Sequence, residues 1–142
     1  MRTSARNMLK GSVESIAIGA VNSEVTLRLD NGVLIYSIIT NESVTSLGLA
    51  PGREATALIK SSWVILTAAD EKIVTSARNR LCGVVTKIDR GAVNAEVVMD
   101  LGYDTSFTAI ITNESQNMLK LVVGSPACAL VKASHVILAI EK

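Results

Sequence analysis

Hydrophobic and polar residues alternate along much of the chain, which is the pattern of half-buried β-strands. Between Glu24 and Asp30 every second residue is apolar. Asn31-Gly32 follows and is typical of a tight hairpin turn, which leads into a second alternating segment over Val33–Thr40. The same reasoning predicts three further strands: Gly11–Ile18, Arg53–Lys60 and Ser62–Ala68. One half of the chain therefore accounts for five strands.

One segment breaks this alternation. Thr40–Gly48 begins with a threonine that can cap a helix, carries Glu42 in its first turn and stops at glycine, so we expect a short helix between the third and fourth strands. Five strands of a small closed sheet with a helix after the third are the layout of an oligonucleotide/oligosaccharide-binding (OB) barrel. Closure also removes the unpaired edges of such short strands. An SH3-like barrel is the competing small fold.

The five-stranded unit occurs twice in the sequence, and the two copies align with an offset of 72 residues and no gap. Roughly half of the aligned positions between Thr3–Leu66 and Thr75–Leu138 are identical. The recurring segments of the first half are Ser4-Ala5-Arg6-Asn7, Gly19-Ala20-Val21-Asn22 with Glu24, Ile39-Thr40-Asn41-Glu42-Ser43, Lys60 and Val64-Ile65-Leu66. The prediction is an all-β chain of two tandem OB-like five-stranded barrels, each with one short helix, over residues 1–68 and 73–142.

The composition argues against a nucleic-acid-binding protein and against a membrane protein. Fourteen Lys and Arg against 13 Asp and Glu give a net charge of +1, without the basic cluster that binding to a nucleic acid requires. The four aromatic residues do not recur between the halves, so a stacking platform for bases is not expected. No apolar run approaches the ~20 residues that span a bilayer, and the polar start lacks a signal-peptide core, so we expect a cytoplasmic protein without membrane contact.

Candidate catalytic residues are sparse. The single histidine, His135, is matched by Trp63 in the first half, and neither a phosphate-binding loop nor a dinucleotide-binding glycine motif is present. Cys82 and Cys128 lack metal or redox spacing, so we interpret them as small apolar filler. We therefore expect neither an enzyme, nor an organic cofactor, nor a site for a free metal cation.

Several recurring polar segments suit a small anion. Thr40 and Ser43 start the short helix, where free N–H groups and the helix dipole favour negative charge. Lys60 ends an apolar strand, and Ser4 and Arg6 add a hydroxyl and a planar guanidinium. Each also has an ordinary structural interpretation: a helix cap, a lysine reaching solvent and an exposed charge. Gly19–Asn22 is in the same way either a strand-connecting turn or a second ligand site.

Taken together, Ser-Ala-Arg-Asn, Gly-Ala-Val-Asn-x-Glu, Ile-Thr-x-Glu-Ser and Lys-x-x-Trp-Val-Ile-Leu resemble the molbindin (Mop) family, and their doubling resembles its double-Mop members. The resemblance covers essentially the whole chain. It implies a cytoplasmic protein that binds molybdate or tungstate for storage, buffering or delivery, as a homotrimer with the oxyanions at interfaces between units. A tandem OB module for nucleic acid or another small anion, and a ligand-sensing regulatory subunit, are the alternatives.

The resemblance also implies site residues. In the first half, Ser4, Ala5, Arg6, Lys60 and Ser61 of one unit would face Thr40 and Ser43 of a partner unit. The matching residues of the second half are Ser76, Ala77, Arg78, Lys132, Ala133, Thr112 and Ser115. The change from Ser61 to Ala133 removes one hydroxyl, so we expect the two classes of site to differ in strength. A further class would use Val21, Asn22, Val93 and Asn94 near a threefold axis.

Overall fold

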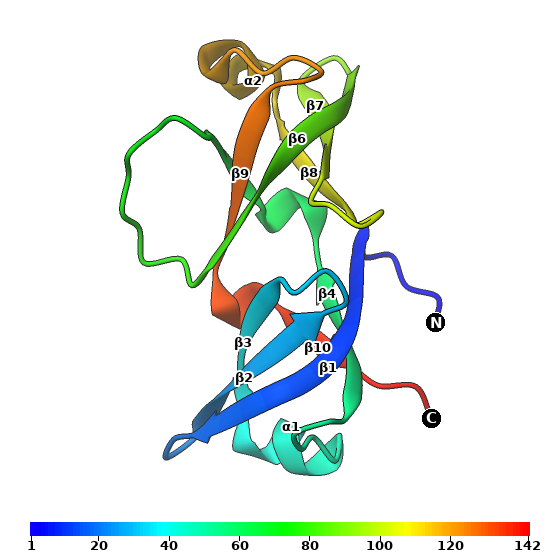
Figure 1. The fold of residues 1–142 in the computed structure, drawn as a ribbon. Helices are drawn as coiled ribbons and strands as arrows, with labels where there is room; N and C mark the ends of the chain where they lie inside the picture. The colour runs from blue at the N-terminus through cyan, green and yellow to red at the C-terminus, as the bar shows by residue number, and fades with distance from the viewer.

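Two β-barrels lie end to end along the long axis of the molecule (Figure 1). The computed structural model describes residues 1–142. It contains two five-stranded antiparallel sheets, with strand orders β10-β4-β1-β2-β3 and β5-β9-β6-β7-β8. The outer strands of each sheet meet, since β10 contacts β3 and β5 contacts β8. The predicted all-β class with OB-like barrels is confirmed.

Each half repeats the same order of elements. The first half contains β1 (Asn7–Ile18), β2 (Asn22–Leu29), β3 (Leu34–Thr40), α1 (Asn41–Ser46), β4 (Glu54–Ile59), the 3-10 turn η1 (Ser61–Trp63) and β5 (Ile65–Ala68). The second half contains β6 (Asn79–Arg90), β7 (Asn94–Asp100), β8 (Ser106–Thr112), α2 (Asn113–Leu119), β9 (Pro126–Val131), η2 (Ala133–His135) and β10 (Ile137–Ala139). The predicted segment Ser62–Ala68 thus consists of most of a 3-10 turn and a shorter strand.

The fifth strand of each barrel comes from the other half of the chain. β5 pairs with β9 of the second half, and β10 pairs with β4 of the first half. The boundaries 1–68 and 73–142 therefore describe the repeat in the sequence, whereas each barrel is completed by a strand from across that boundary. Exchange is possible because Val64-Ile65-Leu66 and Val136-Ile137-Leu138 are identical, so each strand fits either sheet.

The core follows the alternation seen in the sequence. Val25 and Leu27 on β2 are fully buried and Leu29 is 4% exposed. Burying one such side chain stabilises the fold by about 1.5–3 kcal/mol. Val64 and Val136, which precede the exchanged strands, belong to the same apolar cluster of 24 residues drawn from both halves. The two barrels therefore share one continuous core.

Two glycines allow neighbouring strands to approach closely. A Cβ atom on Gly11 would lie 2.3 Å from the carbonyl oxygen of Arg28, and one on Gly83 would lie 2.1 Å from that of Asp100. Gly11 and Gly83 are equivalent in the repeat, and each lies shortly before an irregularity in the pairing of its strand. Only glycine fits at these positions without displacing backbone.

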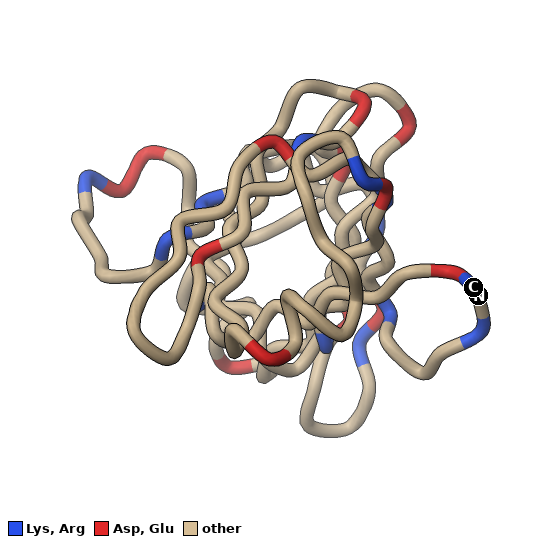
Figure 2. Tube along the Cα trace, turned by 90° about the horizontal axis from the view of Figure 1, so that it is seen from below, with Lys and Arg blue, Asp and Glu red and all other residues tan.

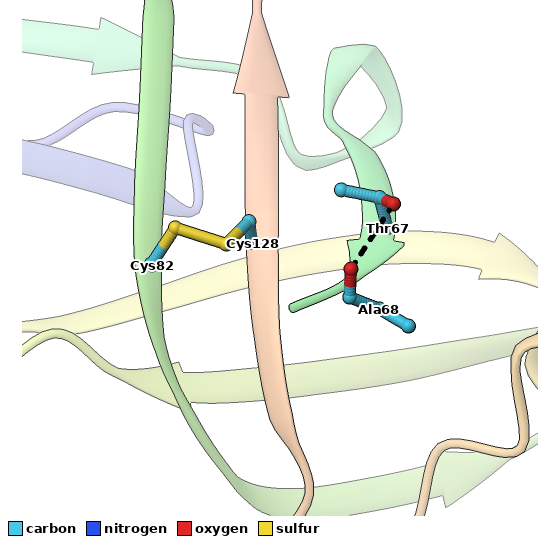
Figure 3. The surroundings of a disulfide bond; sticks show 4 residues. All are labelled: Thr67, Ala68, Cys82 and Cys128. Atoms are coloured by element: carbon cyan, nitrogen blue, oxygen red, sulfur yellow. Dashed lines mark hydrogen bonds between the residues drawn. A yellow bond between two sulfur atoms is a disulfide. The ribbon is translucent and has the colours of Figure 1, made fainter. Parts of the chain in front are cut away.

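The two cysteines are paired. Cys82 on β6 and Cys128 on β9 stand opposite each other in the ladder and form a disulfide, with their Cα atoms 4.0 Å apart (Figure 3). The expectation that both are apolar filler is wrong, because strand pairing brings together residues that lie 46 positions apart. The equivalent residues of the first half, Lys10 and Thr56, also stand opposite each other and cannot cross-link.

Charged residues of both signs are interspersed around the barrels in the view along the long axis (Figure 2). The two chain ends lie together in this view, and the Met1 ammonium donates to Glu141 Oε1 at 3.1 Å. Neither α1 nor α2 has the length and apolar composition that a membrane-spanning helix needs. The surface thus agrees with the near-zero net charge of the sequence.

Candidate functional site

The first group of predicted site residues lies where β1 meets β4. Asn7 stands opposite Ile59 at the end of this ladder, so Arg6 and Lys60, the next residues outward, lie at the same end of the two strands. Lys60 is exposed, whereas Ser61 is only 4% exposed at the start of η1. The structure therefore brings Arg6 and Lys60 to the same end of the two paired strands, with Ser4 and Ala5 just before Arg6 in the chain and Ser61 just after Lys60.

The second half repeats this arrangement. Asn79 stands opposite Val131, which places Arg78 and Lys132, the next residues outward, at the same end of the two strands. Lys132 is exposed, and Ala133 is buried at the start of η2. Equivalent chemistry is thus available at the junction of the two barrels from both halves of the chain.

Thr40 and Ser43 form the cap of α1. Thr40 Oγ1 accepts a hydrogen bond from the Ser43 N–H at 3.1 Å and donates to Ser43 Oγ at 2.8 Å. Thr112 and Ser115 repeat both bonds at α2, at 3.0 and 2.8 Å. The ordinary interpretation of these residues as helix caps is therefore confirmed. Both threonines are exposed, so their oxygens remain open to a partner.

The Gly-Ala-Val-Asn segments are turns that adjoin these caps. The Asn41 N–H donates to the Val21 carbonyl at 2.9 Å, and its side-chain amide donates to the Gly19 carbonyl, also at 2.9 Å. Asn22 stands opposite Thr40 in the ladder between β2 and β3. The second half again matches, with Asn113 bound to Val93 and Gly91 and with Asn94 opposite Thr112. The prediction of a strand-connecting turn is confirmed.

The predicted donors therefore form two separate groups in each half. The strand-end group consists of Ser4–Arg6 with Lys60 and Ser61, or of Ser76–Arg78 with Lys132 and Ala133. The helix-cap group consists of Thr40 and Ser43, or of Thr112 and Ser115. No side-chain hydrogen bond joins the two groups within one half. A pocket of about 460 Å³ is lined by Thr112 and Ser115 of the helix-cap group, by the adjoining Asn94, and by Ser62 and Ile65 of the first half. Residues from both halves of the chain thus contribute to the surface around the donors.

The two arginines face carboxylates of the opposite half. Arg6 donates to both oxygens of Glu96, with Nη1–Oε2 at 2.9 Å and Nη2–Oε1 at 2.6 Å. Arg78 donates to Glu24 and stacks over Tyr36, with its guanidinium carbon 4.0 Å from the ring centroid. The Arg6 hydrogen bond lowers the pKa of Glu96 below its usual value, while Glu96 raises that of Arg6. The guanidinium expected to hold an oxyanion is thus occupied by an internal carboxylate in this structure.

Two asparagines have a role that sequence reasoning missed. Asn7 donates from Nδ2 to the Thr108 carbonyl at 2.8 Å, and its Oδ1 accepts from the Thr108 N–H at 2.7 Å. Asn79 makes the same pair of bonds to the backbone of Tyr36, at 2.8 and 2.7 Å. Ser-Ala-Arg-Asn therefore fastens each half to the other. The sequence did carry a signal for these contacts, because Asn7 and Asn79, like Glu24 and Glu96, recur with the 72-residue offset of the repeat.

The residues at positions 63 and 135 meet each other across the junction. The ring centroids of Trp63 and His135 lie 5.0 Å apart, and Lys60 Nζ lies 5.7 Å from that of Trp63. An aromatic ring 40% exposed thus stands beside the strand-end lysine of the first half. No group of three or more His, Cys, Asp or Glu side chains is placed to hold a metal cation.

Known proteins resemble this chain in sequence and in fold. A solved structure of the cytoplasmic molybdate-binding protein ModG, with molybdate bound, is 43% identical and matches with a TM-score of 0.96 over 99% of this chain and 100% of that chain. The molybdenum-pterin-binding protein MopA of Rhodobacter capsulatus is 50% identical over 98% of this chain and 52% of its own length. The molybdenum transport protein ModE of Azotobacter vinelandii is 44% identical over 99% of this chain and 52% of its own length.

The chain spans about half the length of these two curated relatives. The TOBE domain family matches it twice, over residues 3–66 and 75–138, which coincide with the two halves of the repeat. The resemblance noted in the sequence is therefore confirmed, and the chain belongs to the TOBE-domain family as a tandem, double-Mop member.

Proposed function

We propose that this protein reversibly binds molybdate or tungstate in the cytoplasm, where it stores, buffers or delivers the oxyanion without chemical conversion. The main support is the full-length structural match to ModG, whose structure holds molybdate. The names of two relatives, a molybdenum-pterin-binding protein and a molybdenum transport protein, agree with this proposal. The proposed ligand residues are the strand-end and helix-cap groups of both halves, with Val21, Asn22, Val93 and Asn94 as a further class.

The chemistry of these groups suits a tetrahedral dianion. The strand-end group offers one exposed ammonium, from Lys60 or Lys132, and the helix-cap group offers two hydroxyls per helix. A dianion held by both groups gains charge-assisted hydrogen bonds, each worth about 1.5–3 kcal/mol. Because the arginines are paired with Glu96 and Glu24, we assign the decisive positive charge to the lysines.

Completion of the site by another chain explains why the two groups do not meet within one half. Apolar residues at equivalent positions are exposed near both groups: Ile65 at 64% and Ile137 at 52%, and Val21 at 71% and Val93 at 69%. Their burial in a homotrimer would exclude water from the bound anion and strengthen its electrostatic contacts. Oxyanion and assembly would then stabilise each other, since a ligand bound only by the assembled form favours that form.

A tandem OB module for nucleic acid is not favoured. Such surfaces place stacking aromatics along a basic groove. Here Trp63 packs against His135, Tyr36 lies under Arg78, and neither sign of charge gathers on the barrels.

The test is isothermal titration calorimetry with molybdate in phosphate-free buffer. We expect Lys60→Ala to weaken one class of sites by about 10- to 100-fold, since it removes one charge-assisted contact. Lys87→Ala is the matched control, because Lys87 is an exposed lysine paired with Asp89 outside both groups. Equal affinity in wild type and Lys60→Ala would disprove the lysine assignment, and absence of heat from wild type with both molybdate and tungstate would disprove the function.

Native mass spectrometry tests the assembly. We expect a trimer that retains molybdenum or tungsten after incubation with the oxyanion. A monomer without either metal at saturating oxyanion would contradict the interface sites.

A further inference from the structure

The disulfide distinguishes the second half of the chain from the first. It joins two neighbouring strands (Figure 3). Cys82 is exposed on β6, whereas Cys128 is 1% exposed on β9. β9 is flanked by β6 and by the exchanged strand β5, on which Thr67 stands opposite Cys128. The sulfur–sulfur bond thus has one residue open to solvent and one held inside the sheet.

The strands that the disulfide joins are the strands that carry the strand-end group of the second half. Arg78 directly precedes β6 and Lys132 directly follows β9, so Cys82 lies four residues after Arg78 and Cys128 lies four residues before Lys132. Four strand residues span about 13 Å, so the cross-link holds the two strands together about 13 Å from the proposed oxyanion contacts. It restricts sliding and fraying of the two strands that set the spacing of Arg78 and Lys132.

We infer that Cys82 and Cys128 form a reversible dithiol–disulfide couple, which makes the oxyanion sites of the second half dependent on redox state while those of the first half are not. This inference rests on the proposed oxyanion function. In a reducing compartment, disulfides are usually transient, catalytic or redox-sensing rather than permanent. The first half serves as an internal reference, because Lys10 and Thr56 occupy the same paired positions without sulfur.

The chemistry requires a dithiol as reductant. A thiolate of the dithiol attacks the sulfur of exposed Cys82, forms a mixed disulfide and releases Cys128 as a thiolate that takes a proton. The second thiol of the reductant then attacks the mixed disulfide, forms the cyclic disulfide of the reductant and releases Cys82, which also takes a proton. Two electrons and two protons thus pass from the dithiol to the protein, and a disulfide oxidant reverses the step.

The experiment compares oxidised and dithiothreitol-reduced protein. Thiol titration in denaturant should give no free thiol before reduction and two per chain after it. Because the disulfide spans 46 positions, we expect reduction to lower the thermal midpoint by about 10 °C. In molybdate calorimetry, we expect reduction to lower the affinity of about half of the strand-end sites three- to tenfold, because the strands beside these sites are then no longer held in place before the anion binds.

Two variants sharpen the result. Cys82→Ser should match the reduced wild type with or without reductant. Lys10→Cys combined with Thr56→Cys places a cysteine pair at the equivalent position of the first half, and its Lys60 sites should then also respond to reductant. Identical molybdate isotherms for oxidised and reduced wild type, with reduction verified by thiol titration, would overturn the inference. So would two free thiols in protein prepared under air.

Failure of the underlying function is recognised separately. If neither redox state binds molybdate, the proposed function is disproved and the redox control of the site is overturned with it. Thiol count and thermal midpoint would then still establish whether the couple itself exists, because neither measurement involves molybdate.

Discussion

Replacing Asn7 with alanine tests the connection between the two halves of the chain. Asn7 is 2% exposed, and its amide satisfies both backbone groups of Thr108, which is itself 7% exposed. Alanine leaves one buried N–H and one buried carbonyl without partners. Each unpaired group costs about 1–3 kcal/mol, so with partial access of water we expect a loss of about 3 kcal/mol.

The assay is urea denaturation at a fixed protein concentration, with the free energy of unfolding extrapolated to water. A fixed concentration is needed because assembly contributes to apparent stability. The expected loss corresponds to a thermal midpoint about 10 °C lower than that of wild type. Asn117→Ala is the matched control, since Asn117 is exposed and makes a single side-chain hydrogen bond, to Arg90.

The control should lose no more than about 0.5 kcal/mol. If Asn7→Ala is no less stable than Asn117→Ala, the buried pair of hydrogen bonds does not hold the halves together and the reasoning fails. Asn79→Ala should repeat the result, because Asn79 makes the equivalent bonds to Tyr36.

Three further predictions concern single positions. Glu96→Gln should destabilise the protein at neutral pH, because it removes the carboxylate that pairs with Arg6. Since Arg6 lowers the pKa of Glu96, the stability difference between wild type and variant should disappear as the pH falls from about 4.5 through that lowered pKa. Urea denaturation at a series of pH values measures this difference. Asp104→Gly should change the thermal midpoint by no more than about 2 °C, because relief of the φ of 58° and the greater freedom of glycine in the unfolded chain are each worth about 1 kcal/mol and oppose each other. Gly83→Ala should lower the free energy of unfolding by about 1–3 kcal/mol or more, because its Cβ would meet the Asp100 carbonyl at 2.1 Å; an unchanged urea midpoint would contradict the close approach.

The local elements were predictable from the sequence, but the path of the chain between barrels was not. Alternation and turn residues identified the strands, and the capping Thr40 identified the helix. The exchange of β5 and β10 could not be detected in the pattern, because both strands begin with Ile-Leu after a buried valine and fit either sheet. Periodicity reports which face of a strand is buried and not which neighbour buries it.

The same limit applies to the site, where contacts between the two barrels could not be predicted from the sequence. The family resemblance grouped Lys60 with Arg6, and the ladder between β1 and β4 places the two residues at the same end of paired strands. That Arg6 meets Glu96 depended on packing between the barrels, since a guanidinium pairs as well with a carboxylate as with an oxyanion. The disulfide was missed for a related reason: only the register of β6 against β9 places Cys82 beside Cys128.

Strand exchange has a consequence for synthesis of the protein on the ribosome. β1 to β4 emerge early, but the strand that completes their barrel, β10, is made about 80 residues later. The first barrel therefore keeps an open sheet edge until nearly all of these residues have been translated, and such an edge is prone to pair with other chains. The identical segment at β5 emerges first and can occupy that edge temporarily. Correct assembly then requires β5 to leave for β9 as β10 arrives, so the two halves of the repeat reach their final state together.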